Sequence, residues 1–105
     1  AASSVSWKDS LGRMRGLRLA IISGKLVVGS SSAVDLLLVG DNMSAVTIKN
    51  LVKKIEKDRK TEINYAVISY DDFYYRMSVK DRFIMDIERN KHSVLVDTEN
   101  IMRKE

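Results

Sequence analysis

The sequence predicts a single domain of the α/β (α+β) class, with a mixed central sheet of about four strands and helices packed mainly on one face. The chain has 105 residues, of which 45% are hydrophobic and 30% charged, as in an ordinary globular domain with one core. Four short apolar runs are bounded by turn residues, and two longer stretches have helical periodicity. Their order along the chain is typical of strands that alternate with helices.

The four apolar runs predict strands over residues 17–22, 34–39, 63–68 and 93–96. Gly16 and the dipeptide Ser23-Gly24 bound the first run, and the three residues Leu26, Val27 and Val28 either extend it or begin a return. The run over 34–39 is continuously apolar, which indicates burial on both faces at the centre of a sheet. We therefore expect Leu36 and Leu38 in the core.

Two helices are predicted, over residues 44–59 and 79–89. The first has Ser44 or Asn42 as its cap and one apolar stripe, formed by Ile48, Leu51, Val52 and Ile55. Its opposite face is rich in lysine, which is usual for a solvated face. The second begins after Ser78 and has an apolar side formed by Val79, Phe83, Ile84 and Ile87. Before it, Ser69 caps a short helical turn over residues 73–77. We expect Leu51, Ile55 and Phe83 to be buried.

The basic residues that produce the net charge of +4 are concentrated at the N-terminal end of the chain. Residues 1–25 contain five basic residues and one acidic residue, so they hold the whole excess. We divide the chain into a basic N-terminal segment or linker, residues 1–16, and a domain, residues 17–105; residues 1–6 have the composition of a processed, tag-derived or cut edge. Arg13, Arg15 and Arg18 are candidate contacts for nucleic acid, although a solvated linker is the commoner use of such a segment.

Several kinds of functional site lack the residues they need. The chain has one histidine, His92, and no cysteine, which excludes zinc sites of the His/Cys type and Cys/His nucleophilic pairs. It contains neither a P-loop nor a G-x-G-x-x-G motif. No apolar run approaches the roughly 20 residues that a transmembrane helix requires, and no secretory signal is visible. These observations predict a cytoplasmic protein with no membrane partner.

One constellation remains, and it lies around the second strand. Ser23-Gly24 follows the first strand, and a short polar excursion leads to Ser32, Ala33 and the run Val34-Asp35-Leu36-Leu37-Leu38-Val39-Gly40. Over residues 17–97 this pattern resembles the nucleotidyltransferase superfamily related to DNA polymerase β. It is similar to small prokaryotic domains of that superfamily that are fused to a winged helix-turn-helix.

The resemblance implies a site in which Ser23, Gly24 and Lys25 bind a nucleotide and Asp35 binds a metal ion. Active members carry two carboxylates one residue apart, which hold two magnesium ions. Here Ala33 occupies the first position. A third carboxylate is also missing, since the next strand offers Asn64 and Tyr65. The serine of the Gly-Ser pair is replaced by Lys25, unless the register shifts to Gly29-Ser30.

Three functions remain open. The first is a catalytically degenerate domain that serves as a regulatory or interaction module within a DNA-binding transcriptional regulator. The second is an active nucleotidyltransferase that uses magnesium, with Asp35 and either Asp41 or Asp97 as irregular ligands and Lys25 on phosphate. The third is a structural domain that forms a homo-oligomer through Phe73, Tyr74 and Tyr75, for which the plainer interpretation is a buried Phe73 and half-exposed tyrosines.

Overall fold

Four short strands form one mixed sheet in the computed structural model, which describes residues 7–98. The strands are β1 (Leu17–Ile22), β2 (Leu36–Gly40), β3 (Tyr65–Ile68) and β4 (Ser93–Asp97). They lie in the order β3-β2-β1-β4, in which only β2 and β3 are parallel. The predicted mixed sheet of four strands is confirmed, with each strand within two residues of its expected start.

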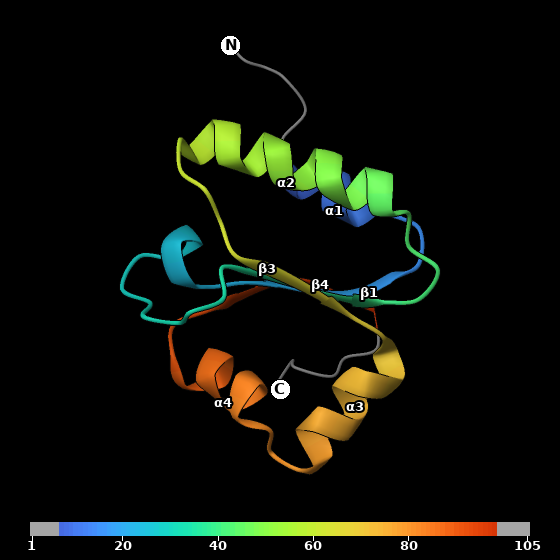
Figure 1. The fold of residues 1–105 in the computed structure, drawn as a ribbon, viewed down its shortest axis with the longest axis vertical. Coiled ribbons are helices and arrows are strands. Elements are labelled where there is room, and N and C mark those ends of the chain that lie inside the picture. The colour runs from blue at the N-terminus through green and yellow to red at the C-terminus, as the bar shows by residue number, and fades with distance from the viewer. Residues whose placement is uncertain (1–6, 99–105) are drawn as a thin grey trace.

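Helices cover both faces of this sheet, so the prediction of helices mainly on one face is wrong. The helices α1 (Trp7–Arg13) and α2 (Ala45–Arg59) lie on one side, and α3 (Tyr70–Ser78) and α4 (Arg82–Arg89) lie on the other (Figure 1). A 3-10 turn, η1 (Gly24–Leu26), follows β1 in place of the extension or return that was considered. The described chain therefore has three layers.

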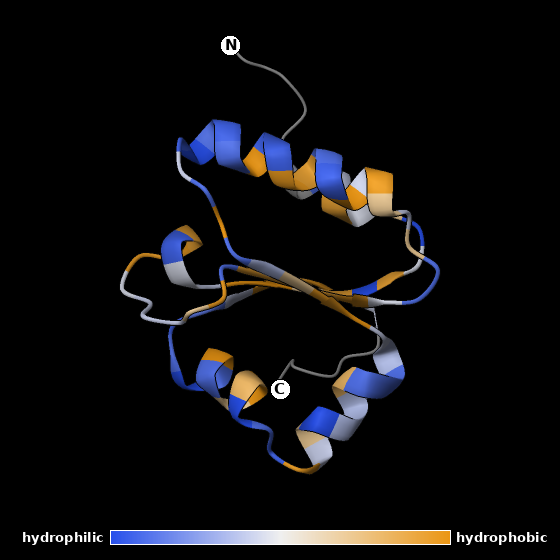
Figure 2. Ribbon diagram, in the orientation of Figure 1, coloured by the Kyte–Doolittle hydropathy of each residue, from blue (hydrophilic) through white to orange (hydrophobic). Residues whose placement is uncertain are grey.

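The central strands require this double cover because they are apolar on both faces. Alternate residues of β1 enter different cores: Ala20 and Ile22 pack toward α1 and α2, while Leu19 and Ile21 pack toward α3 and α4. The hydropathy colouring shows the same pattern, with an apolar sheet between helices whose outer sides are polar (Figure 2). The α-helices contribute the following buried residues to the two cores: Trp7, Leu11, Ile48, Leu51, Val52 and Ile55 on one side, and Phe73, Ile84 and Ile87 on the other.

Helix α1 lies within the stretch that was predicted as a basic segment or linker, residues 1–16. Trp7 is 5% exposed and Leu11 1% exposed, and the Trp7 indole Nε1 donates a hydrogen bond to the Asp58 carboxylate of α2 at 3.1 Å. Trp7, Leu11 and Met14 lie four and then three residues apart, so the period of a helix was present in the sequence. The described part of this stretch thus belongs to the domain core.

The helix caps explain most of the boundaries. Ser44, rather than Asn42, caps α2 by accepting from the Thr47 amide, and Ser69 caps α3 as expected. The turn expected over 73–77 is a nine-residue helix, α3. Helix α4 begins later than predicted, because Asp81 rather than Ser78 caps it.

Two residues of the predicted α4 stripe consequently lie elsewhere. Val79 precedes the helix and is 52% exposed. Phe83 is half-buried, with the guanidinium of Arg76 over its ring. The other core predictions, Leu36, Leu38, Leu51 and Ile55, are confirmed. Within residues 7–98, no helix combines the length and the apolar content needed to cross a membrane.

Candidate functional site

Asp35 lies at the entrance to β2 and is 1% exposed. Its Oδ1 accepts a hydrogen bond from the backbone amide of Lys25 at 2.7 Å, and its Oδ2 accepts one from the backbone amide of Asn64 at 2.8 Å. The carboxylate therefore connects the turn after β1 to the residue that precedes β3. Hydrogen bonds between amides and an ionised carboxylate are short and strong, so Asp35 acts as a clamp between three strands.

The Ser23-Gly24-Lys25 turn encloses this carboxylate. The Ser23 hydroxyl donates to the Val34 carbonyl, and the Gly24 amide donates to the Ser30 hydroxyl at 2.9 Å. Gly24 has φ +54°, and a Cβ at this position would overlap the Asp35 carboxylate, so only glycine fits. The Ser30 contact shows that the alternative pair, Gly29-Ser30, belongs to the same loop.

The Lys25 side chain points out of this turn. Its Nζ donates to the Glu62 carbonyl at 2.9 Å, just before β3. Lys25 therefore holds the turn against the sheet edge at two points, through its backbone amide and through its ammonium group. Ser23, Gly24 and Lys25 do lie beside Asp35, but their polar groups bond to the protein itself.

Sequence reasoning missed two residues that hold the serine-rich loop, Asp86 of α4 and Asn90, which caps the C-terminus of that helix. The Asp86 carboxylate accepts from the Ser32 hydroxyl at 3.1 Å and from the Ala33 amide at 3.3 Å. The Asn90 side-chain oxygen accepts from the Ser31 amide at 3.3 Å. The available signal was their spacing of four residues, which places two polar side chains on one face of a helix.

This set of donors does not fit a pair of magnesium ions. Magnesium takes oxygen ligands in near-ideal octahedral geometry, and active members of the superfamily hold it with several carboxylates. Here both oxygens of Asp35 accept backbone amides, and Ala33 has no ligand atom. Within residues 7–98, no three histidine, cysteine or acidic side chains gather closely enough to form a metal site.

The two other acidic candidates lie at the opposite end of the sheet. Asp35 precedes Leu36, which pairs with Ile22 at the end of β1. Asp41 follows Gly40, the partner of Leu17 at the start of β1, and Asp97 pairs with Leu19. The length of the strands therefore separates Asp41 and Asp97 from Asp35.

The three candidate arginines also separate. Arg13 and Arg15 are exposed and line a pocket of about 300 Å³ beside the first turn of α2, together with Met14, Asn42, Ser44 and Thr47. Arg18 lies on β1, with its guanidinium 4.6 Å from the centre of the Tyr70 ring and 3.9 Å from the Asp41 carboxylate. Arg18 thus faces α3, on the side of the sheet opposite α2.

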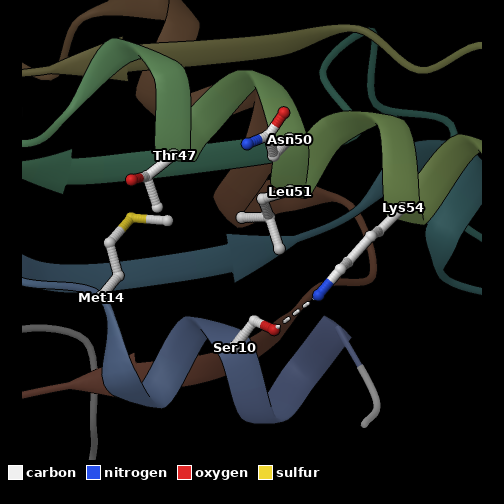
Figure 3. Close-up of a pocket in the computed structure, with 6 residues that line it drawn as sticks. All are labelled: Ser10, Met14, Thr47, Asn50, Leu51 and Lys54. Carbon is white, nitrogen blue, oxygen red and sulfur yellow. Dashed lines mark hydrogen bonds between the residues drawn. The ribbon is translucent and has the colours of Figure 1, made fainter. Parts of the chain in front are cut away.

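A second pocket, of about 140 Å³, lies between α1 and α2. Six residues line it: Ser10, Met14, Thr47, Asn50, Leu51 and Lys54. The Lys54 ammonium donates to the Ser10 hydroxyl at 3.5 Å, which connects the two helices across the pocket (Figure 3). Because Met14 and Thr47 line both pockets, the two adjoin along the seam between α1 and α2.

The aromatic cluster of α3 divides between core and surface, as the plainer interpretation expected. Phe73 is fully buried, whereas Tyr74 is 61% exposed and Tyr75 64% exposed. Tyr74 stacks on Tyr70 with ring centres 6.3 Å apart. His92 lies outside the Asp35 network, and its Nδ1 is 2.9 Å from the Asn90 carbonyl oxygen.

Comparisons of the chain with protein-family models, with curated proteins and with solved structures find no match in any of the three.

Proposed function

We propose that the chain is a non-catalytic domain of the nucleotidyltransferase type that serves as a regulatory or interaction module, within a DNA-binding transcriptional regulator. The observation that carries the proposal is the state of Asp35. The one carboxylate left from the catalytic pattern is buried, and each of its oxygens accepts a backbone amide. A carboxylate used in this way holds the fold together and offers no face to a metal ion or a nucleotide.

The arrangement around β2 supports the nucleotidyltransferase part of the proposal. A Ser-Gly turn after the first strand stands next to an aspartate that enters the second strand, and a helix connects this strand to a parallel third one. These are the relative positions that the superfamily pattern implies for Ser23, Gly24 and Asp35. The chain has this arrangement of strands and turn but carries Ala33 where the first carboxylate is expected. This combination favours a domain that has the fold of the superfamily and does not catalyse nucleotide transfer.

Calorimetry with nucleotides and metal ions tests the proposal. Magnesium or manganese is titrated into the protein with each nucleoside triphosphate in turn, and labelled nucleotide is followed onto protein, nucleic acid and small acceptors. We expect neither metal-dependent binding nor transfer, because transfer needs metal ions that bridge the phosphates. Metal-dependent transfer that Asp35→Asn abolishes in a folded variant would overturn the proposal in favour of the active enzyme.

An exposed patch on α3 favours a homo-oligomer as a second candidate function. Tyr74 and Tyr75 of α3 and Val79, which follows the helix, are each more than half exposed. Analytical ultracentrifugation at increasing protein concentration tests this candidate, with Tyr74→Ser/Tyr75→Ser as the variant. Association that the variant abolishes would support it, and a monomer at all concentrations would exclude it.

A further inference from the structure

Positive charge gathers in one of the three layers. Residues 7–16 and 42–62 form α1, α2 and the adjoining turns, and they contain nine basic and four acidic residues, a net charge of +5. Residues 69–92 form α3 and α4 with the segments beside them, and they contain five basic and five acidic residues. The chain therefore has one basic face and one neutral face.

The carboxylates of α2 do not neutralise the lysines of this face. Glu56 accepts from the Ile63 amide at 3.1 Å, beside the sheet, and Asp58 accepts from the Trp7 indole, on the side of α1. Three exposed lysines of α2 and the lysine that caps its C-terminus make no ion pair within the described residues: Lys49, Lys53, Lys57 and Lys60.

The neutral face uses its charges differently. Arg76 contacts both Asp72, at 3.2 Å, and Asp81, at 3.1 Å. The hydrogen bond with Asp72 is the largest cause that raises the pKa of Arg76 above its ordinary value. Arg76 is thus paired within the molecule, whereas Lys49, Lys53 and Lys57 of α2 are exposed and make no ion pair among the described residues.

The lysine row has dimensions that suit a phosphate backbone. Lys49, Lys53 and Lys57 are four residues apart, so they rise along the helix by about 6 Å each and span about 12 Å. One strand of a duplex presents a phosphate about every 3.4 Å along its axis, so the row lies alongside roughly three to four phosphates. Arg13 and Arg15 add two exposed cations beside the first turn of α2, where they line the larger pocket.

From this arrangement we propose that the α1/α2 surface docks the phosphate backbone of double-stranded nucleic acid. The surface consists of six side chains: Arg13, Arg15, Lys49, Lys53, Lys57 and Lys60. This inference rests on the proposed function, since it names the partner of the interaction module. The sequence alone favours a solvated face for the lysines. The structure adds two exposed arginines beside the N-terminal turn of the same helix and shows that the α2 carboxylates bond elsewhere.

Two other polyanions fit the surface less well. Proteins that bind single strands stack the bases on aromatic side chains, and neither α1 nor α2 exposes one, because Trp7 is buried. A helix that lies in a membrane surface inserts an apolar face, and the apolar stripe of α2 is buried against the sheet. A duplex needs only an array of cations, which the surface provides.

Fluorescence anisotropy with a labelled duplex of mixed sequence tests the proposal with the whole chain. Affinity is measured between about 50 and 200 mM salt for the parent protein, for Lys53→Gln/Lys57→Gln, and for Arg82→Gln/Arg89→Gln. Arg82 and Arg89 are exposed on the neutral face, so the second pair removes the same charge as a matched control. All four positions are on the surface, and circular dichroism confirms that each variant is folded.

We expect the lysine pair to make the slope of log affinity against log salt shallower by about two units, since about one unit is lost with each phosphate contact. One unit is a tenfold difference in affinity for each tenfold change in salt. The control pair should leave the slope unchanged. Absence of duplex binding at low salt, an equal effect of both pairs, or tighter binding to phosphatidylserine vesicles would each overturn the docking surface. None of these results bears on nucleotide transfer. The proposed non-catalytic function is therefore tested separately, by the calorimetry and transfer assays.

Discussion

At the scale of single residues, Asp35 joins the turn after β1 to the residue before β3 through hydrogen bonds to two backbone amides. Removal of its charge should therefore affect stability, whether or not any ligand is present. In Asp35→Asn the new amide group must point one of its N–H donors at a backbone N–H, which leaves a buried donor without an acceptor. We expect the free energy of unfolding to fall by about 1–3 kcal/mol.

Urea denaturation measures this loss, and Asp41→Asn is the matched control. Asp41 is exposed and lies 3.9 Å from Arg18, so its change should alter stability by no more than about 0.5 kcal/mol. Equal effects of the two changes would mean that the Asp35 clamp contributes nothing to stability.

The glycines give a second contrast at this scale. Gly24 has φ +54° and its missing Cβ faces the Asp35 carboxylate, whereas Gly12 lies in α1 with open space around its Cα. Gly24→Ala should destabilise the protein by more than about 1 kcal/mol, because the clash adds to the backbone strain. Gly12→Ala should stabilise it by about 0.4–1 kcal/mol. Thermal unfolding of both variants measures the difference in sign.

The residues that lie beside Asp35 could be predicted from the sequence, but the hydrogen bonds that they form could not. Ser23, Gly24, Lys25 and Asp35 were placed together through their likeness to a known pattern. Their partners are mostly backbone groups, at Asn64, Val34 and Glu62, which a pattern of side chains does not reveal. Asp86 lies more than 50 residues further along the chain, and only tertiary packing brings it to the loop.

At the scale of elements, α2 docks by its apolar stripe, and Leu51 lies at the centre of that stripe. Leu51→Ala should lower the free energy of unfolding by about 2–5 kcal/mol, because the change leaves a cavity under the helix. Val46 lies on the same helix and is 68% exposed, so Val46→Ala should change stability by about 0.5 kcal/mol or less. A loss below about 1 kcal/mol for Leu51→Ala would mean that the stripe does not hold the helix.

Helix α1 offers a test of whether residues 7–13 belong to the domain. Trp7→Ala should cost about 3–5 kcal/mol, since it removes a large buried side chain. Trp7→Phe should cost less, because it keeps most of the apolar contact and loses the hydrogen bond to Asp58. Circular dichroism at increasing urea measures both. If Trp7→Ala leaves the free energy of unfolding unchanged, residues 7–13 are a linker and not part of the domain core.

The elements were predictable where apolar runs were long, and their arrangement was not. The strand over 34–39 was expected to be buried on both faces, and this already required helices on both sides of the sheet. The prediction of helices mainly on one face is wrong because α3, predicted as a short turn, is a nine-residue helix that buries Phe73 against the second face. Helix α1 was not predicted, since the excess of basic residues indicates a linker while the spacing of Trp7, Leu11 and Met14 indicates a helix packed on the core.

At the scale of the whole molecule, the sheet is closed by parts of the chain that are far apart in sequence. Strand β1 lies between β2 and β4, and Leu19 pairs with Asp97. Shortening the chain to residues 1–92 removes β4 and leaves one edge of β1 unpaired. We expect this fragment to lose its cooperative unfolding transition, since half of the pairing of a central strand is absent. A sharp thermal transition in the fragment would contradict this expectation.

The late position of β4 also matters while the protein is being made. The first three strands and α1 to α4 leave the ribosome before residues 93–97 do, so for that interval β1 is an open edge with apolar residues on both faces. An exposed edge of this kind is a template for pairing with another chain. The nascent domain is therefore most prone to aggregation while its last strand is still inside the ribosome. Slow translation at the stage when residues 93–97 are in the exit tunnel should lower the yield of folded protein more than slow translation at the stage when residues 41–60 are there.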